Sequence, residues 1–435
     1  MLLSVLLLLV GHAKAGYNGA VFTYSTKDVQ GKKFSVMHRY KLSYSSYEEL
    51  ELRCTSCSNT EESIGEWCLG EFASKWKNMN CGSYDDGLNT GNWIDNRNSI
   101  STSLAQMFVE VRNRSDINKP NSSPQTRVLP VVRVPSNCPR NISLLTFDPD
   151  GDEVKCRYAS SSLECDTCTP PSVFSLSSSC MLSFSPTGSS SEGPYAVQLM
   201  MEDFPREIIT LTQNDGSISL RNTSSALSKI PVQFVFKVDP AAPSCTEGEY
   251  LPKFLSPTPE HGAQIFIDVN QTLEIPIRAE ATQSVITELL FSGPVDVVKN
   301  SSGSGHFTLR WTPSGDENDE SHPICFVVQA NVTSSVYQSV HRCVVVTVGN
   351  RPTVTSTTVV APTIPLTTSN PPPRTSYLTV LKLKISTMLS LKDNHEFILK
   401  AIKDELIRRG LHPDIKVHLV HPVQWKLKKQ LPPSG

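Results

Sequence analysis

Three acidic residues alternate along one short segment in the first half of the chain. Asp148, Asp150 and Asp152 lie in the run DPDGD, around Gly151. Ca²⁺ takes about six to eight oxygen ligands, and alternating carboxylates around a turn can supply several. The run is not an EF-hand, because its glycine is fourth in the loop and Ala159 stands where a glutamate should be. We predict a calcium site of another kind, with a tight turn bearing solvated acids as the alternative.

Two further acids are expected to join this cluster. Residues 143–147 and 195–201 are predicted strands. If they correspond to strands B and F of a sandwich, the loops that follow them lie at the same pole of the domain. Glu202 and Asp203 directly follow the second of these strands. The predicted metal ligands are therefore Asp148, Asp150, Asp152, Glu202 and Asp203, with Ca²⁺ as the one cofactor expected.

The twelve cysteines offer a second kind of chemistry. The spacings Cys54-x-x-Cys57 and Cys165-x-x-Cys168 would suggest zinc or redox work in a cytosolic protein, whereas a secreted chain favours disulfides. Five cysteines fall between residues 138 and 180 and three between 245 and 343. Both numbers are odd, so at least one bridge should cross between the two groups, and Cys245 is the natural candidate.

One pairing can be predicted from strand order. Cys325 and Cys343 lie on consecutive predicted strands, which we expect to be antiparallel neighbours, and we predict a disulfide between them. Nucleophile elbows, zinc-protease motifs, phosphate-binding loops and dinucleotide fingerprints are missing from the sequence. We therefore expect no enzyme.

The N-terminus indicates secretion. An apolar run at residues 2–10 precedes Ala13-Lys14-Ala15, the small-x-small pattern of a signal-peptidase site, although a buried apolar strand is the alternative. A net charge of −2 gives no reason to expect nucleic acid as a partner. Glycosylation is predicted at the Asn-x-Ser/Thr sequons of Asn113, Asn121, Asn141, Asn222, Asn270, Asn300 and Asn331.

The elements that must position these residues are predicted to be mainly β. Apolar residues alternate with polar ones in many short segments, and the pattern repeats weakly over two runs of about 105 residues, as in tandem immunoglobulin-like or cadherin-like sandwiches. Residues 352–376 contain eleven Ser or Thr and six Pro, a composition typical of an O-glycosylated stalk. The expected organisation is a signal peptide at 1–15, a cystine-containing β domain at 16–126, sandwiches at 127–243 and 244–350, a stalk at 351–376, and a strand-helix-strand segment at 377–435.

Two short segments carry a resemblance to a known family. The DPDGD run after a strand, and the run from Leu309 through Trp311 to Pro313 before a strand, resemble dystroglycan-type cadherin-like modules. The first copy has Phe184 in place of the tryptophan, and the second has Glu280 followed by Ala-Thr where the aspartates should be. The tail after the stalk resembles half of a SEA domain. The resemblance implies extracellular adhesive or ligand-binding sandwiches.

We therefore expect an extracellular adhesion or recognition protein that binds a protein or glycan through sandwich loops, with or without calcium. The alternative is a soluble carbohydrate-binding or defence protein that uses Trp67, Trp76 and Trp93 of the N-terminal part. No apolar stretch after the stalk is long enough to anchor the chain. Membrane anchoring is not expected from this sequence, although longer forms could reach the cell surface.

Overall fold

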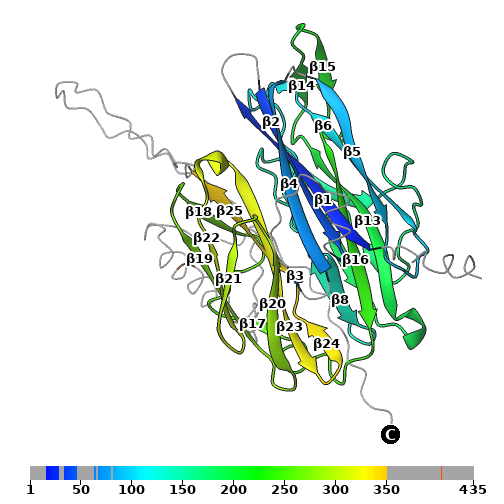
Figure 1. Cartoon of the computed structure of the whole chain (residues 1–435). Coiled ribbons are helices and arrows are strands. Elements are labelled where there is room, and N and C mark those ends of the chain that lie inside the picture. Colours follow the sequence, from blue (N-terminus) through cyan, green and yellow to red (C-terminus); the bar gives the residue numbers. More distant parts are fainter. Residues whose placement is uncertain are drawn as a thin grey trace, which may run out of the picture. The chain divides into compact units, whose positions relative to one another are not determined.

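The computed structural model describes residues 16–28, 34–46, 63–64, 67–79, 82–349 and 403. Between residues 16 and 349 its regular elements are β-strands and two single-turn 3₁₀ helices, Ser189–Ser191 and Gly315–Glu317. The predicted mainly-β fold class is confirmed (Figure 1). The signal peptide, the stalk and nearly all of the C-terminal segment lie outside the described residues, as do Cys54, Cys57 and Cys81. Within the described part no helix is long and apolar enough to cross a membrane.

One large sheet unites strands from distant parts of the chain. Its path, in order, is β10 (Glu153–Tyr158), β13 (Gly193–Phe204), β16 (Lys229–Asp239), β1 (Tyr17–Asp28), β2 (Phe34–Tyr44), β4 (Trp67–Met79) and β3 (Ser63–Ile64). The first strand of the chain meets β16 where Val21 pairs with Val232. The N-terminal strands therefore extend the sheet of the first sandwich.

Shorter strands complete this part of the fold. They are β5 (Ser83–Asn92), β6 (Thr102–Glu110), β7 (Asn113–Arg114), β8 (Val131–Pro135), β9 (Arg140–Ser143), β11 (Phe174–Leu176), β12 (Met181–Phe184), β14 (Ile209–Thr212) and β15 (Ile218–Arg221). The sheet β11-β12-β9 packs on the large sheet through aromatic contacts. The ring of Phe236 lies 4.7 Å from that of Phe174 and 5.8 Å from that of Phe184, measured between centroids.

A single hydrophobic core spans the expected boundary at residue 126. It contains Phe22 from β1, Met107 from β6 and Phe234 from β16, all fully buried. In β6 every second residue is buried, as a strand with one face in a core requires. Residues 16–126 and 127–243 therefore share one sheet and one core.

The second sandwich follows the expected two-layer plan. One layer has β17 (Lys253–Leu255), β19 (Leu273–Glu280), β22 (His306–Trp311) and β21 (Val298–Gly303). The other has β18 (Ala263–Ile267), β25 (Arg342–Val348), β23 (Ser321–Val332) and β20 (Val285–Ser292), with β24 (Ser335–Gln338) beside β23. In β19, Ile275, Ile277 and Ala279 face the core while the residues between them are exposed.

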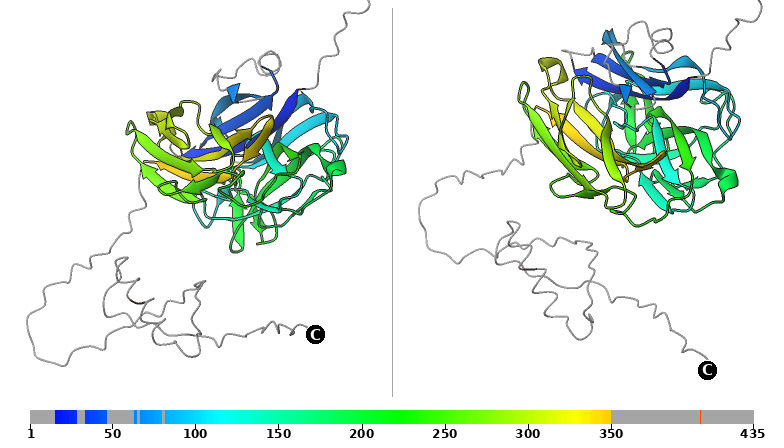
Figure 2. Two further views of the ribbon diagram at one scale, coloured as in Figure 1. Left: turned by 90° about the horizontal axis from the view of Figure 1, so that it is seen from below. Right: turned by 60° about the horizontal axis from the view of Figure 1, so that its bottom comes forward.

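The two sandwiches lie side by side and belong to one compact unit (Figure 2). Lys41 of β2 donates a hydrogen bond to the carbonyl of Gly293, 2.9 Å away. The buried carboxylate of Glu320 pairs with Lys27, 2.8 Å away, and with Arg39. The contact between the sandwiches is thus partly ionic and is shielded from water.

Candidate cation site

The acidic run and β13 are brought together by strand pairing. Residues 148–152 lie in the loop before β10, and β10 pairs with β13 so that Val154 stands opposite Asp203. Carboxylate oxygens of Asp148, Asp152 and Asp203 consequently lie within 4.8 Å of one another. Three of the five predicted ligands therefore share one site.

Residues 148–152 also form the tight turn that was predicted as the alternative to a calcium site. Asp148 Oδ1 accepts hydrogen bonds from the backbone N–H groups of Asp150 (2.9 Å) and Asp152 (3.1 Å). Gly151 has φ +84°, a left-handed conformation that favours glycine. Asp148 Oδ2 is buried and has no hydrogen-bond partner among the described residues. Asp148 therefore brings to the cluster a carboxylate with one buried oxygen that lacks a hydrogen-bond partner among the described residues.

Asp203 faces Asp148 from β13 and is fully buried. Its Oδ1 accepts two hydrogen bonds of 2.6 Å from the backbone and hydroxyl of Ser228, and its Oδ2 accepts one of 2.7 Å from Asn121. Burial raises the pKa of Asp203 to about 7. Burial, and then the neighbouring charge of Asp203, raises the pKa of Asp148 well above its usual value. Neither carboxyl group has an ion-pair partner among the described residues.

A buried arginine already neutralises the third acid. Arg114 donates to both oxygens of Asp152, with Nη2 2.8 Å from Oδ1, and also to Asp116, 2.7 Å away. Burial alone would lower the pKa of Arg114, but its hydrogen bonds to Asp152 and Asp116 raise it. Arg114 was not among the predicted site residues, because no local pattern links it to an aspartate 38 residues further on.

The other two predicted ligands lie apart from the site. Asp150 pairs with Lys119, 2.6 Å away, and accepts a hydrogen bond from the backbone of Ser122. Glu202 accepts hydrogen bonds from Arg157, with its Oε1 3.0 Å from Nε and 2.9 Å from Nη2. The prediction was wrong for Glu202, because successive side chains of a strand point to opposite faces and Asp203 takes the inner one.

Burial also corrects one glycosylation prediction. Asn121 is fully buried, and its side chain donates to Asp203 and accepts from Arg114, so the folded protein has no room for a glycan there. Asn141, Asn222, Asn270 and Asn300 are exposed, whereas Asn113 and Asn331 are half-buried. Glycosylation at these six sites stays a prediction.

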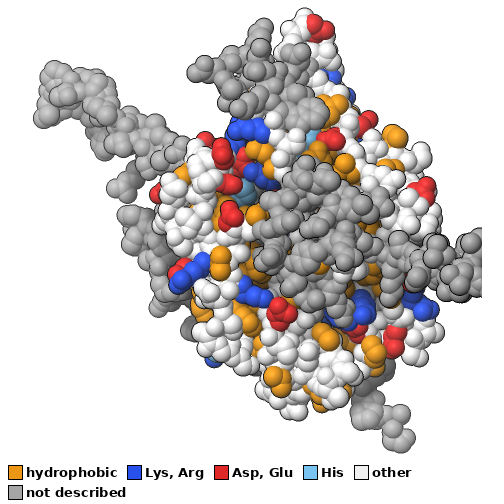
Figure 3. Space-filling model, viewed as in Figure 1, with side chains coloured by type: hydrophobic (Ala, Val, Ile, Leu, Met, Phe, Trp, Pro, Cys, Tyr) orange, Lys and Arg blue, Asp and Glu red, His pale blue; other side chains and the backbone are white. Residues whose placement is uncertain are grey.

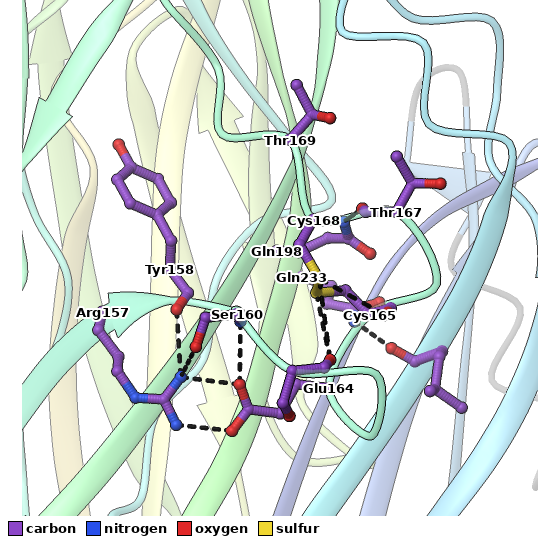
Figure 4. Close-up of a disulfide and its surroundings, with 12 residues drawn as sticks. Arg157, Tyr158, Ser160, Glu164, Cys165, Thr167, Cys168, Thr169, Gln198 and Gln233 are labelled. Carbon is purple, nitrogen blue, oxygen red and sulfur yellow. Dashed lines mark hydrogen bonds and ion pairs between the residues drawn. A yellow bond between two sulfur atoms is a disulfide. The ribbon is translucent and has the colours of Figure 1, made fainter.

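Four disulfides link eight of the nine described cysteines in pairs, and the ninth, Cys68 of β4, is buried with a free thiol. The pairs are Cys138–Cys245, Cys156–Cys180, Cys165–Cys168 and Cys325–Cys343. The last joins directly opposed residues of β23 and β25, as expected from strand order. Cys245 pairs with Cys138, so this disulfide links the two groups of cysteines, as predicted. The Cys165–Cys168 bridge closes a short loop beside the ion pair of Arg157 and Glu164 (Figure 4).

The N-terminal part offers no sugar-stacking surface at Trp93. This side chain is only 2% exposed and packs edge-on against Tyr17, with ring centroids 4.7 Å apart. The side chains of Trp67 and Trp76 lie outside the described residues. Elsewhere in the same sheet, buried His38 of β2 contacts Asp86 (2.6 Å) and the hydroxyl of Tyr84 (2.7 Å). Burial raises the pKa of Tyr84, so the Tyr84 hydroxyl keeps its proton at neutral pH.

Calcium fits the cluster in part. Asp148 and Asp203 supply buried carboxylate oxygens without a counter-cation, which is the donor type that Ca²⁺ prefers. Asp152 can join them only while sharing its oxygens with Arg114. The protein would thus supply fewer than the usual six to eight ligands, and water would complete the shell.

No family model matches this chain, and no curated protein matches it. The strand architecture alone is similar to that of solved structures, at very low scores. The sialic-acid-binding region of a Streptococcus sanguinis SK1 adhesin is 11% identical, with 52% of this chain and 78% of that chain covered and a TM-score of 0.19. Human protocadherin-24 EC1-2 is 10% identical, with 53% and 100% covered and a TM-score of 0.16.

An endo-fucoidan hydrolase of glycoside hydrolase family 107 is 10% identical and has a TM-score of 0.18, and the match spans 75% of this chain but only 39% of the hydrolase. At such scores these neighbours decide neither family nor function.

Proposed function

We propose that this chain is an extracellular recognition or adhesion protein whose first sandwich binds Ca²⁺ between Asp148, Asp203 and Asp152. The observation that carries the proposal is the buried pair of Asp148 and Asp203, which lacks a compensating cation among the described residues. Two buried carboxylates cannot both be charged without a large cost in free energy unless a cation joins them. At neutral pH a divalent cation removes that cost, whereas at low pH a proton does.

The cluster borders a polar cavity that a partner could enter. Its volume is about 210 Å³, and its lining includes Lys119, Ser122 and Pro149 as well as Arg39 and Glu320. Asp150 forms an ion pair with Lys119 and accepts a hydrogen bond from the backbone of Ser122, so the acidic turn contacts two residues of the cavity lining. Calcium at the turn would therefore order the cavity and make recognition calcium-dependent.

Surface charge agrees with a protein or glycan partner. Acidic and basic side chains are interspersed on the visible described surface, with no broad field of one sign (Figure 3). Nucleic acid binding would require such a basic field. The carbohydrate-binding alternative through the N-terminal part loses the support of Trp93, which is buried.

Calorimetric titration of the full secreted chain with Ca²⁺ tests the metal site. We expect saturable binding in the wild type, and its loss in D148N and in D203N. The matched control is E202Q, which removes the adjacent carboxylate on the opposite face of β13 and should leave binding unchanged. An absence of binding in the wild type, or equal loss in E202Q, would contradict the site.

Cell-surface or matrix binding by the same preparations tests the recognition role. Retention on cells should fall when EDTA replaces Ca²⁺, and D148N should match the EDTA result. Calcium binding without any cell-surface or matrix retention would leave a structural metal site and would refute the adhesive role.

A further inference from the structure

A second pocket lies on the first sandwich, away from the acidic cluster. It encloses about 330 Å³ between β6, the loop at residues 159–168 and the start of β16. Its apolar lining comes from Phe108, Leu163 and Met200, and its cationic lining from Arg221 and Lys229. This size lies within the range of pockets that bind small ligands, about 300–1,000 Å³.

Arg221 is the unusual residue of this pocket. Its Nε atom is buried without a hydrogen-bond partner, and its guanidinium makes no ion pair with any described residue. Lys229 lies 3.7 Å from Glu202, which already binds Arg157 at 2.9 Å, and its charge also acts on Glu164. A buried donor with no acceptor costs about 1–3 kcal/mol, more for a charged group. Arg221 is therefore the cation of this pocket that the described residues leave without an acceptor.

Two acids lie on the pocket lining, Asp85 and Glu164, and neither forms an ion pair with Arg221 among the described residues. Glu164 forms two hydrogen bonds with Arg157, 2.6 and 2.8 Å long, and points toward it in Figure 4. Burial opposes its ionisation, yet Arg157 lowers the pKa of Glu164 to about 2, so this charge is permanent and already paired. The Cys165–Cys168 bridge and a 2.8 Å hydrogen bond from Gln198 to the carbonyl of Thr167 hold this loop in place.

We propose that this pocket binds a single carboxylate next to an apolar group, namely the C-terminus of a partner protein whose last side chain is apolar. Arg221, assisted by Lys229, would receive the carboxylate, and Phe108 and Leu163 would contact the apolar side chain. The carboxylates of Asp85 and Glu164, both on the lining, disfavour phosphate or sulfate, which carry more charge. Phe108 is the one aromatic ring on the described lining, which gives a sugar little to stack on.

This site is independent of the proposed calcium function. None of its lining residues belongs to the acidic cluster, and binding should persist in EDTA. Failure of one proposal therefore leaves the other standing.

Two pairs of small probes test the site on the full secreted chain by NMR titration. N-acetyl-leucine should bind, and N-acetyl-leucinamide, which lacks the carboxylate, should bind at least about tenfold more weakly, as expected for a lost charged hydrogen bond. Glucuronate and glucose form the corresponding sugar pair. Equal binding of the two leucine probes, or selective binding of glucuronate alone, would overturn the proposal.

Variants locate the binding. R221Q should weaken N-acetyl-leucine binding about tenfold or more, whereas R310Q, at an exposed arginine of the second sandwich, should not change it. Leu163 is 59% exposed, so L163D should fold normally while it places a repelling carboxylate at the pocket. Unchanged binding in L163D would overturn the assignment even if R221Q folds poorly.

Discussion

Asp203 should make stability depend on pH in a direction opposite to that of an ordinary paired carboxylate. Its pKa is about 7 in the folded protein, against about 3.9 in an unfolded chain. The folded state therefore holds this proton more tightly. Its contribution to stability is complete below about pH 4 and is lost as the pH rises through about 7.

We predict that, in EDTA, the unfolding free energy of wild type relative to D203N falls by roughly 2–3 kcal/mol between pH 5 and pH 8. Buried His322 and His341 have lowered pKa values and act in the opposite direction, but they do so in both proteins. Urea denaturation at the two pH values measures the difference. Added Ca²⁺ should reverse the fall at pH 8. A difference that grows with pH would show that Asp203 is charged in the folded state.

For single residues, the sequence predicted five acids to meet, of which three do, and it did not predict what surrounds them. The spacing of Asp148 and Asp152 and the expected neighbourhood of the segment around Asp203 brought these three together, although Asp203 lies within β13 and not in the loop after it. Arg114 and Asn121 come from a segment whose alternation shows no sign of this contact. Their role depends on tertiary packing, which no local pattern encodes.

Among the elements, the junction of β1 with β16 depends on one glycine. Gly19 has φ +142° at an irregularity in the pairing of β1 with β2, and a Cβ there would lie 2.2 Å from the carbonyl oxygen of Gln233. Both the backbone conformation and the close approach of β16 exclude a side chain.

We predict that Gly19→Ala destabilises the protein by about 2 kcal/mol or more, from backbone strain and displacement of β16. Thermal and urea unfolding measure the loss. Gly82→Ala is the matched control, since nothing lies within 4 Å of its added Cβ. Equal effects of the two substitutions would contradict the close packing of β1 on β16.

Strand periodicity predicted the elements better than it predicted their partners. Ile275 and Ile277 alternate with exposed residues along β19, which is the sequence pattern that predicts a strand with one buried face. Apolar residues also alternate near period two over residues 20–26, within β1, yet this pattern carries no information about pairing with a strand 211 positions away (232 minus 21). A period of two in the apolar residues specifies which face of a strand is buried. The strand with which it pairs depends on the packing of the whole core.

At the scale of the whole molecule, the disulfides should differ greatly in their effect on stability. Cys138–Cys245 closes a loop with a sequence separation of 107 residues, whereas Cys165–Cys168 closes one of 3. Chain-entropy arguments assign about 5 kcal/mol to the long loop and about 2 kcal/mol to the short one.

We predict that the double variant C138S/C245S loses more than twice the unfolding free energy that C165S/C168S loses. Urea denaturation of both variants beside the wild type provides the comparison. A larger loss from C165S/C168S would show that its short loop does more than limit the unfolded chain.

The pairing of β1 with β16 also sets an order of events during synthesis. A ribosome adds about 5–20 residues per second, so the 211 residues between Val21 and Val232 take roughly 10–40 s to make. Asn121 is made 111 residues before Val232, so for roughly 5–20 s it is available to the glycosylation machinery, because Asp203 and Ser228, which form its site, do not yet exist. If the chain is secreted as proposed, a glycan added there would prevent the sheet from closing, and the yield of folded protein depends on Asn121 escaping modification until translation has passed β16.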